Sequence, residues 1–113
     1  MEHSNQLLHL RSLFGSTVEN VHWDGETLGL SFDTGWRLTI YNEVTYLRGS
    51  QSTRKDHRQL MGAVVLGVQQ DVNHLKLQLS GSKELEIDLR DSAYRGPEAM
   101  LLNGPRGEIV VWN

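Results

Sequence analysis

The sequence predicts an α+β fold that is mostly β: a curved antiparallel sheet or half-open barrel of about eight strands. The first observation is an internal repeat. A shift of 47 residues places residues 13–40 on residues 60–87, with nine of 28 positions identical, where ordinary composition gives about two. The second is the alternation of apolar and polar residues in several short runs. The third is the presence of turn-forming residues between those runs.

The repeat also predicts the domain organisation. The matched positions are almost all apolar or turn-forming, so they encode a scaffold rather than a chemistry. The 113 residues are enough for one ordinary domain, whereas a copy of about 47 residues is near the size that needs help to fold alone. We therefore expect a single domain over residues 1–113. It contains a duplicated helix and three-stranded meander at 4–47 and 51–94, which share one core, and a closing hairpin at 98–113.

Each copy is expected to begin with a helix. In the first copy, residues 4–6 can cap a helix whose apolar face carries Leu7, Leu10 and Phe14, and Gly15 ends it. This helix is expected to plug the concave side of the sheet. In the second copy, Ser52 or Thr53 can cap a short, exposed helix over residues 53–61, ended by Gly62.

A three-stranded meander follows each helix. The valines of its first strand stand three apart, at Val18 and Val21 and again at Val65 and Val68, which breaks the period of two and predicts a β-bulge in both copies. Asp24-Gly25 predicts a tight hairpin turn, and residues 71–73 are its counterpart.

The remaining strands follow from alternation. Residues 28–32 and 36–40 have this pattern in the first copy, and residues 75–79 and 85–89 have it in the second. Residues 42–51 join the copies, and residues 91–97 form a loop. The final hairpin pairs residues 99–102 with residues 108–112 around the turn cluster 103–107.

Composition narrows the possible functions. The chain has no cysteine, so disulfides, thiolate metal sites and a thiol nucleophile are excluded. The net charge is −3, which argues against non-specific nucleic-acid binding. Four bases in residues 48–61 are interpreted as a solvated face. No signal-peptide pattern and no run of about 20 apolar residues is present, so we expect a cytoplasmic protein without a membrane partner.

Catalytic and metal-binding patterns are weak. His22 lies near Asp24, and His74 near Asp71, so either imidazole could act as a base oriented by a carboxylate. However, both aspartates stand at turns, where aspartate is favoured for its bonds to the backbone. No histidine pair or calcium-loop pattern indicates a metal. We predict no catalytic residue, no metal and no cofactor, and thus a protein that is not an enzyme.

The predicted surface contains residues that could bind a partner. Glu84, Glu86 and Asp88 alternate with core residues and form a row of acids on one face of a strand, named here the acidic strip. Such a row is either a solvated face or a docking site for a basic partner. Trp23, Tyr41, Tyr46 and Tyr94 add amphipathic area that could anchor an interface. Trp36 and Trp112 share parity with core residues and are expected to be buried.

One resemblance adds to this picture. The segments Tyr94-Arg95-Gly96-Pro97-Glu98-Ala99-Met100 and Gly107-Glu108-Ile109-Val110-Val111-Trp112 resemble a pattern in small bacterial domains of about this length. The size, acidity and β-rich build resemble immunity proteins of bacterial toxin systems, including contact-dependent growth inhibition. The resemblance implies a cytoplasmic inhibitor that blocks the active site of a cognate toxin, often a basic nuclease, by tight stoichiometric binding. It transfers no binding residue.

Three functions therefore compete. The first is a toxin-neutralising immunity protein that binds through Glu84, Glu86 and Asp88 together with Trp23, Tyr41 and Tyr46. The second is a small-ligand module that uses a pocket inside a half-open barrel, lined by Trp23 or Trp36. The third is an enzyme built on His22 or His74, which requires an imidazole hydrogen-bonded to a carboxylate inside a cleft.

Overall fold

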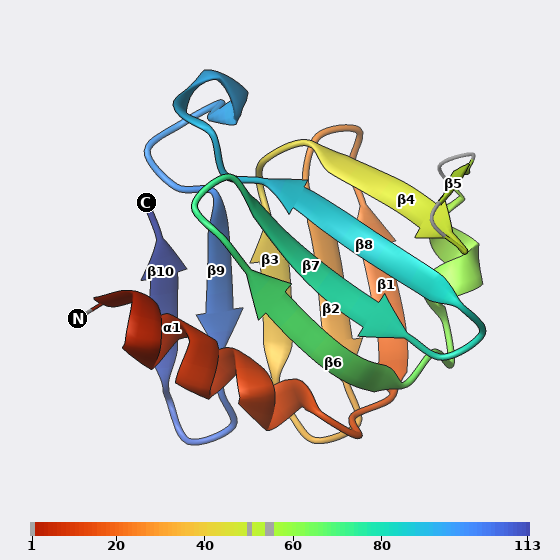
Figure 1. Ribbon diagram of the computed structural model, residues 1–113. Coiled ribbons are helices and arrows are strands. Elements are labelled where there is room, and N and C mark those ends of the chain that lie inside the picture. Colours follow the sequence, from red (N-terminus) through yellow and green to blue (C-terminus); the bar gives the residue numbers. More distant parts are fainter. Residues whose placement is uncertain (1, 50, 54–55) are drawn as a thin grey trace.

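The computed structural model describes residues 2–49, 51–53 and 56–113, and in this part of the chain the fold is mostly β, with two antiparallel sheets of five strands each (Figure 1). The first sheet has the order β1-β2-β3-β9-β10 and the second the order β5-β4-β8-β7-β6. The strands are β1 (Val18–Trp23), β2 (Leu28–Phe32), β3 (Arg37–Ile40), β4 (Val44–Arg48), β5 (Gln51–Ser52), β6 (Val65–Gln70), β7 (His74–Leu79), β8 (Lys83–Asp88), β9 (Met100–Asn103) and β10 (Ile109–Trp112).

The strands thus form two sheets, where the sequence predicted a curved sheet or half-open barrel of about eight strands. The predicted meanders are present as β1–β3 and β6–β8, but each belongs to a different sheet. The strand that follows each meander crosses over and pairs with the other one: β4 pairs with β8, and β9 pairs with β3. The first sheet is thus the meander β1–β3 extended by β9 and β10, and the second sheet is the meander β6–β8 extended by β4 and β5.

Hydrogen bonds at the junction of the two meanders recur with the 47-residue offset. The amide of Gly15 donates to the carbonyl of Val65 at 2.8 Å, and the amide of Gly62 donates to that of Val18 at 2.9 Å. A second pair recurs inside the copies: the amide of Asp33 donates to the carbonyl of Thr17 at 3.0 Å, and the amide of Ser80 donates to the carbonyl of Val64 at 2.9 Å. Thr17 and Val64 themselves form a bridge between the two sheets.

Both predicted bulges are confirmed. The pairing of β1 with β2 shifts register between Val18 and Asn20, and the pairing of β6 with β7 shifts between Val65 and Gly67. A bulge places one extra residue on its strand, which is how valines three positions apart both turn toward the interior.

The two expected helices differ from the prediction in bounds and type. Helix α1 (Glu2–Leu10) begins before the predicted cap and continues as the 3₁₀ turn η1 (Arg11–Leu13). It lies against β10 and β6, at the open side between the two sheets (Figure 1). The second predicted helix is reduced to the 3₁₀ turn η2 (His57–Leu60), and residues 54 and 55 of the prediction lie outside the described residues. A third turn, η3 (Asp91–Ala93), lies in the predicted loop.

The cap of η2 is Asp56, whose carboxylate accepts from the amide of Arg58. Neither Ser52 nor Thr53 caps a helix. Instead, the amide of Thr53 donates to the carbonyl of Tyr46 at 2.7 Å, so this residue extends the pairing of β5 with β4. Thr53, one of the two expected caps, thus pairs with a strand instead.

One buried cluster takes side chains from both sheets. Leu28, Leu30 and Leu38 of the first sheet and Leu75, Leu77 and Leu85 of the second are at most 1% exposed. Trp36 and Trp112 are buried, as expected from their parity. The inward faces of the two sheets are thus occupied by packed apolar side chains, and the polar groups that could act on other molecules lie on the two outer faces.

Candidate functional site

The acidic strip lies on the central strand of the second sheet. Glu84, Glu86 and Asp88 alternate along β8 with the buried Leu85 and Ile87, so the three carboxylates share the outer face. Their side chains are 20%, 29% and 18% exposed. Strands β4 and β7 flank the strip on either side.

Two cations accompany the acidic strip. The ammonium of Lys76 on β7 lies 3.9 Å from one oxygen of Glu84 and 3.9 Å from one oxygen of Glu86. The guanidinium of Arg90 binds both oxygens of Asp88, with its Nε at 3.0 and 3.2 Å. This bond to Arg90 is the main reason that the pKa of Asp88 falls to about 2. Asp88 is therefore ionised at every pH at which the protein would act.

A hollow of about 310 Å³ adjoins the acidic strip. Its lining consists of Gln69, Gln70, Asp71, His74, Lys76 and Glu86. Lys76 and Glu86 belong both to this hollow and to the charged row, since they face each other across β7 and β8. The outer face of the second sheet thus combines a row of carboxylates with a polar depression that could receive a long side chain.

The acids of the strip are not required by the scaffold. The equivalent positions of the first meander, 47 residues earlier, hold Arg37, Thr39 and Tyr41. The core positions between them are kept, with Leu38 matching Leu85 and Ile40 matching Ile87, all fully buried. The same backbone therefore carries two different outer surfaces.

The aromatic residues predicted for the interface are not gathered on the acidic strip. Trp23 lies on β1, at the edge of the first sheet, and its ring stacks on His57 with the centroids 4.6 Å apart. Tyr41 follows β3 and lines a separate hollow of about 290 Å³ with Glu26, Thr27, Arg95, Gly96, Pro97 and Glu98. Tyr94 is partly buried against the core.

Tyr46 is a correction to the predicted site. Its side chain is 3% exposed, because β4 alternates Val44 and Tyr46 into the core. The phenol oxygen lies 2.7 Å from Nδ1 of His57, and burial, with a smaller contribution from Asp56, raises the pKa of Tyr46 to about 12. The phenol is thus neutral at ordinary pH, and the tautomer of His57 decides which of the two groups is the donor. Sequence reasoning treated residues 42–51 as a joint, and so missed the strand that turns Tyr46 inward.

The turn aspartates bind the backbone. The carboxylate of Asp24 accepts from the amides of Glu26 and Thr27 at 2.9 and 2.7 Å. That of Asp71 accepts from Asn73 and His74 at 2.7 and 2.8 Å. These bonds lower the pKa of both carboxyls, with the amide of Thr27 as the largest cause for Asp24 and that of Asn73 for Asp71. Among the described residues neither aspartate is hydrogen-bonded to an imidazole.

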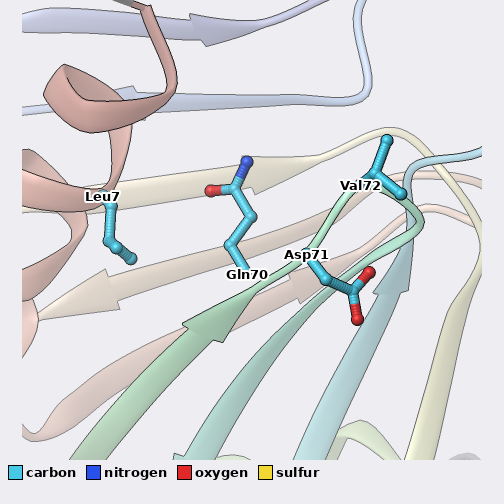
Figure 2. A pocket seen from close by; sticks show the side chains of 4 residues that line it. All are labelled: Leu7, Gln70, Asp71 and Val72. Carbon is cyan, nitrogen blue, oxygen red and sulfur yellow. The ribbon is translucent and has the colours of Figure 1, made fainter.

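A more apolar hollow of about 400 Å³ lies between α1 and the β6–β7 turn. Figure 2 shows Leu7 projecting from the helix and Gln70 from the end of β6, with Val72 on the turn and the carboxylate of Asp71 directed away from the helix. The amide oxygen of Gln70 accepts from the indole of Trp112 at 3.3 Å, which ties the two sheets together beside the hollow.

The described residues contain no group of three or more histidine, cysteine, aspartate or glutamate side chains that could hold a metal. Of the helices described, none has the length and apolar character needed to cross a bilayer.

Comparison with protein families, with curated proteins and with solved structures finds no match to this chain.

Proposed function

We propose that this chain is a non-enzymatic binding protein whose outer second sheet docks on a basic protein. In its most concrete form it is a cytoplasmic immunity protein that neutralises a cognate bacterial toxin, with a basic nuclease domain as the partner. The observation that supports this best is the acidic strip, which occupies the central strand of an open sheet face without being required by the fold. The choice of a toxin rests on the resemblance in size, acidity and β-rich build.

The ion pairs around the acidic strip are compatible with exchange of partners. Lys76 is 32% exposed and contacts Glu84 and Glu86 only at 3.9 Å. Partly exposed pairs of this length contribute about 0–1 kcal/mol, so a guanidinium from a partner, which can bind a carboxylate through two hydrogen bonds, would displace the ammonium at little cost. Complementary charge also speeds the encounter and disfavours wrong partners.

Neutralisation would proceed by occlusion. A toxin that acts on nucleic acid presents a cationic cleft to phosphate, and three carboxylates in a row imitate the charge of that substrate. The face needs no reacting group, since it only has to cover the cleft in a one-to-one complex.

The alternative is a small-ligand module. It predicts a pocket between the sheets lined by Trp23 or Trp36, but neither residue lines the hollows of about 290 to 400 Å³ around Val72, Gly29, Tyr41 and His74. The interior side chains are packed instead. A small ligand would therefore bind in one of the surface hollows rather than between the sheets.

The repeat is part of the same proposal. We attribute the two meanders to duplication of a helix and three-stranded unit, which the hydrogen bonds recurring at an offset of 47 residues support. Duplication explains why one scaffold carries two unlike faces: the core positions are shared, while each outer face diverged.

A charge-reversal experiment tests the docking face. The triple variant Glu84→Lys, Glu86→Lys, Asp88→Lys should lose binding to the basic domain captured by the wild-type protein, measured by calorimetry, while keeping its circular dichroism spectrum. A matched control reverses three exposed acids elsewhere, Glu19→Lys, Glu26→Lys and Asp91→Lys, and should keep affinity within about threefold. Unchanged affinity in the first variant would remove the acidic strip from the interface. Capture of no basic protein at all would contradict the toxin proposal.

A further inference from the structure

A second polar hollow lies on the outer face of the first sheet and has about 300 Å³ of space. It is lined by residues of four adjacent strands: Asn20 and His22 of β1, Gly29, Leu30 and Ser31 of β2, Arg37, Leu38 and Thr39 of β3, and Asn103 of β9. The strand pairing brings these side chains together, since Gly29 stands between His22 and Thr39, and Ser31 stands next to Arg37. The hollow is separate from the acidic strip, which belongs to the other sheet.

Gly29 leaves the floor of the hollow open. Its φ lies outside the left-handed region, and an added Cβ would meet nothing nearer than the Cβ of His22 at 3.6 Å, an ordinary contact. The backbone therefore has no need of glycine here, and the equivalent position of the second meander is Lys76. Glycine inside a strand lowers stability and often marks a place where a ligand approaches the backbone.

The polar side chains around this floor can all donate a hydrogen bond. Arg37 supplies a guanidinium, His22 an imidazole, Ser31 and Thr39 hydroxyls, and two asparagines supply amides, while no carboxylate lines the hollow. The guanidinium of Arg37 forms no ion pair with any residue the structure describes. The acid of β1, Glu19, stands next to Asn20 but does not line the hollow. Asp24, just beyond the strand, has its carboxylate occupied by two backbone amides. In a chain of net charge −3, this is a local site of the opposite character.

We infer that this hollow binds the oxyanion group, carboxylate or phosphate, of a small molecule. Arg37 would supply the charge and a two-pronged hydrogen bond, which suits either group. The hydroxyls and amides would bind the remaining oxygens, and Gly29 would let the ligand reach the sheet. A hollow of this size is at the small end of ligand sites, so it suits a metabolite rather than a macromolecule. This inference is independent of the proposed toxin partner.

Nuclear magnetic resonance titration of the full chain tests the site. The amides of β1, β2 and β3 are followed while inorganic phosphate is added and, in a second series, succinate, with sodium chloride holding the ionic strength constant. We expect saturable shifts at His22, Gly29, Ser31 and Thr39 with at least one of the two anions. A response to phosphate alone or to succinate alone identifies the group that the site prefers.

Three variants make the result decisive. Arg37→Gln should weaken the binding of the responding anion by at least about tenfold. Gly29→Val should abolish the chemical-shift changes while raising the melting temperature. Arg48→Gln, which changes an exposed arginine of the second sheet and hence the net charge equally, should keep the dissociation constant within about twofold. The inference is overturned if neither anion gives saturable shifts, or if Arg37→Gln binds as tightly as Arg48→Gln. It is also overturned if the shifts follow all exposed basic residues alike.

Discussion

Replacing Tyr46 by phenylalanine tests the hydrogen bond that connects η2 to the two sheets. The phenol of Tyr46 reaches out of the core to Nδ1 of His57 at 2.7 Å, and the imidazole stacks on Trp23 with the ring centroids 4.6 Å apart. The edge of β1, the buried strand β4 and the turn η2 thus meet at one imidazole. We expect Tyr46→Phe to release this contact without altering the core.

The expected loss of stability follows from the one hydrogen bond that Tyr46→Phe removes. Phenylalanine keeps the buried ring and removes only the hydroxyl, so no large cavity forms. A neutral hydrogen bond contributes about 0.5–1.5 kcal/mol net. Because His57 is half-buried, water can partly replace the lost hydroxyl as its hydrogen-bond partner, and we expect a loss of about 1 kcal/mol in the free energy of unfolding. For a chain of this size that lowers the melting temperature by roughly 3–6 °C.

Urea unfolding at pH 7 measures the free energy of unfolding of each variant. A double-mutant cycle then shows how much of the loss comes from the contact between Tyr46 and His57. In a His57→Ala background the effect of Tyr46→Phe should nearly vanish, which leaves a coupling energy close to about 1 kcal/mol. A Tyr46→Phe penalty below about 0.3 kcal/mol, or an equal penalty in both backgrounds, would refute the role assigned to this hydrogen bond.

The same residue has an alkaline signature. Burial raises the pKa of Tyr46 from 10.0 to about 12, so the folded state favours the neutral phenol. Its contribution is complete below pH 10 and is lost as the pH rises through about 12. Unfolding measured between these pH values should show this loss in the wild type and not in Tyr46→Phe.

Two further predictions concern the second sheet. Asp88→Asn should remove an acid-dependent part of the stability: the pKa of Asp88 is held at about 2, below its ordinary 3.8, so its contribution is present above pH 3.8 and lost as the pH falls toward 2. Unfolding measured from pH 6 to 2 should therefore decline less steeply in the variant, and an unchanged slope would argue against the pairing with Arg90. Leu77→Ala should cost about 2–5 kcal/mol, because this side chain is fully buried and leaves a cavity. A loss below about 1 kcal/mol in urea unfolding would show that the two sheets are not tightly packed there.

Much of the local structure follows from residues that are close together in the chain. The bulges could be predicted because valines three positions apart break the period of two in both copies. The structure places the register shifts in the same two strands. Gly15 and Gly62 have φ of 80° and 78°, a conformation that glycine adopts without strain. Asp24 was interpretable as a turn residue because its side chain binds amides two and three positions ahead.

The candidate sites could be predicted from the sequence only in part. Alternation placed Glu84, Glu86 and Asp88 on one face, but not the proximity of Lys76, which comes from the neighbouring strand. Tyr46 was assigned to the surface because nothing in the sequence around it indicates that Val44–Arg48 form a strand that pairs with β8. The hollow around Gly29 was missed for the same reason, since its lining is assembled across four strands.

The sequence by itself determined the periodicity of the strands, the positions of the turns and bulges, and which side chains are apolar enough for the core. These depend on the conformational preferences of a residue and its near neighbours. Only the tertiary structure decided that the meanders form two sheets, that β4 and β9 cross to opposite partners, and which residues share an outer face. Those outcomes depend on which strands pair and pack across long stretches of chain, and the free energy of that pairing belongs to the whole fold rather than to any single segment.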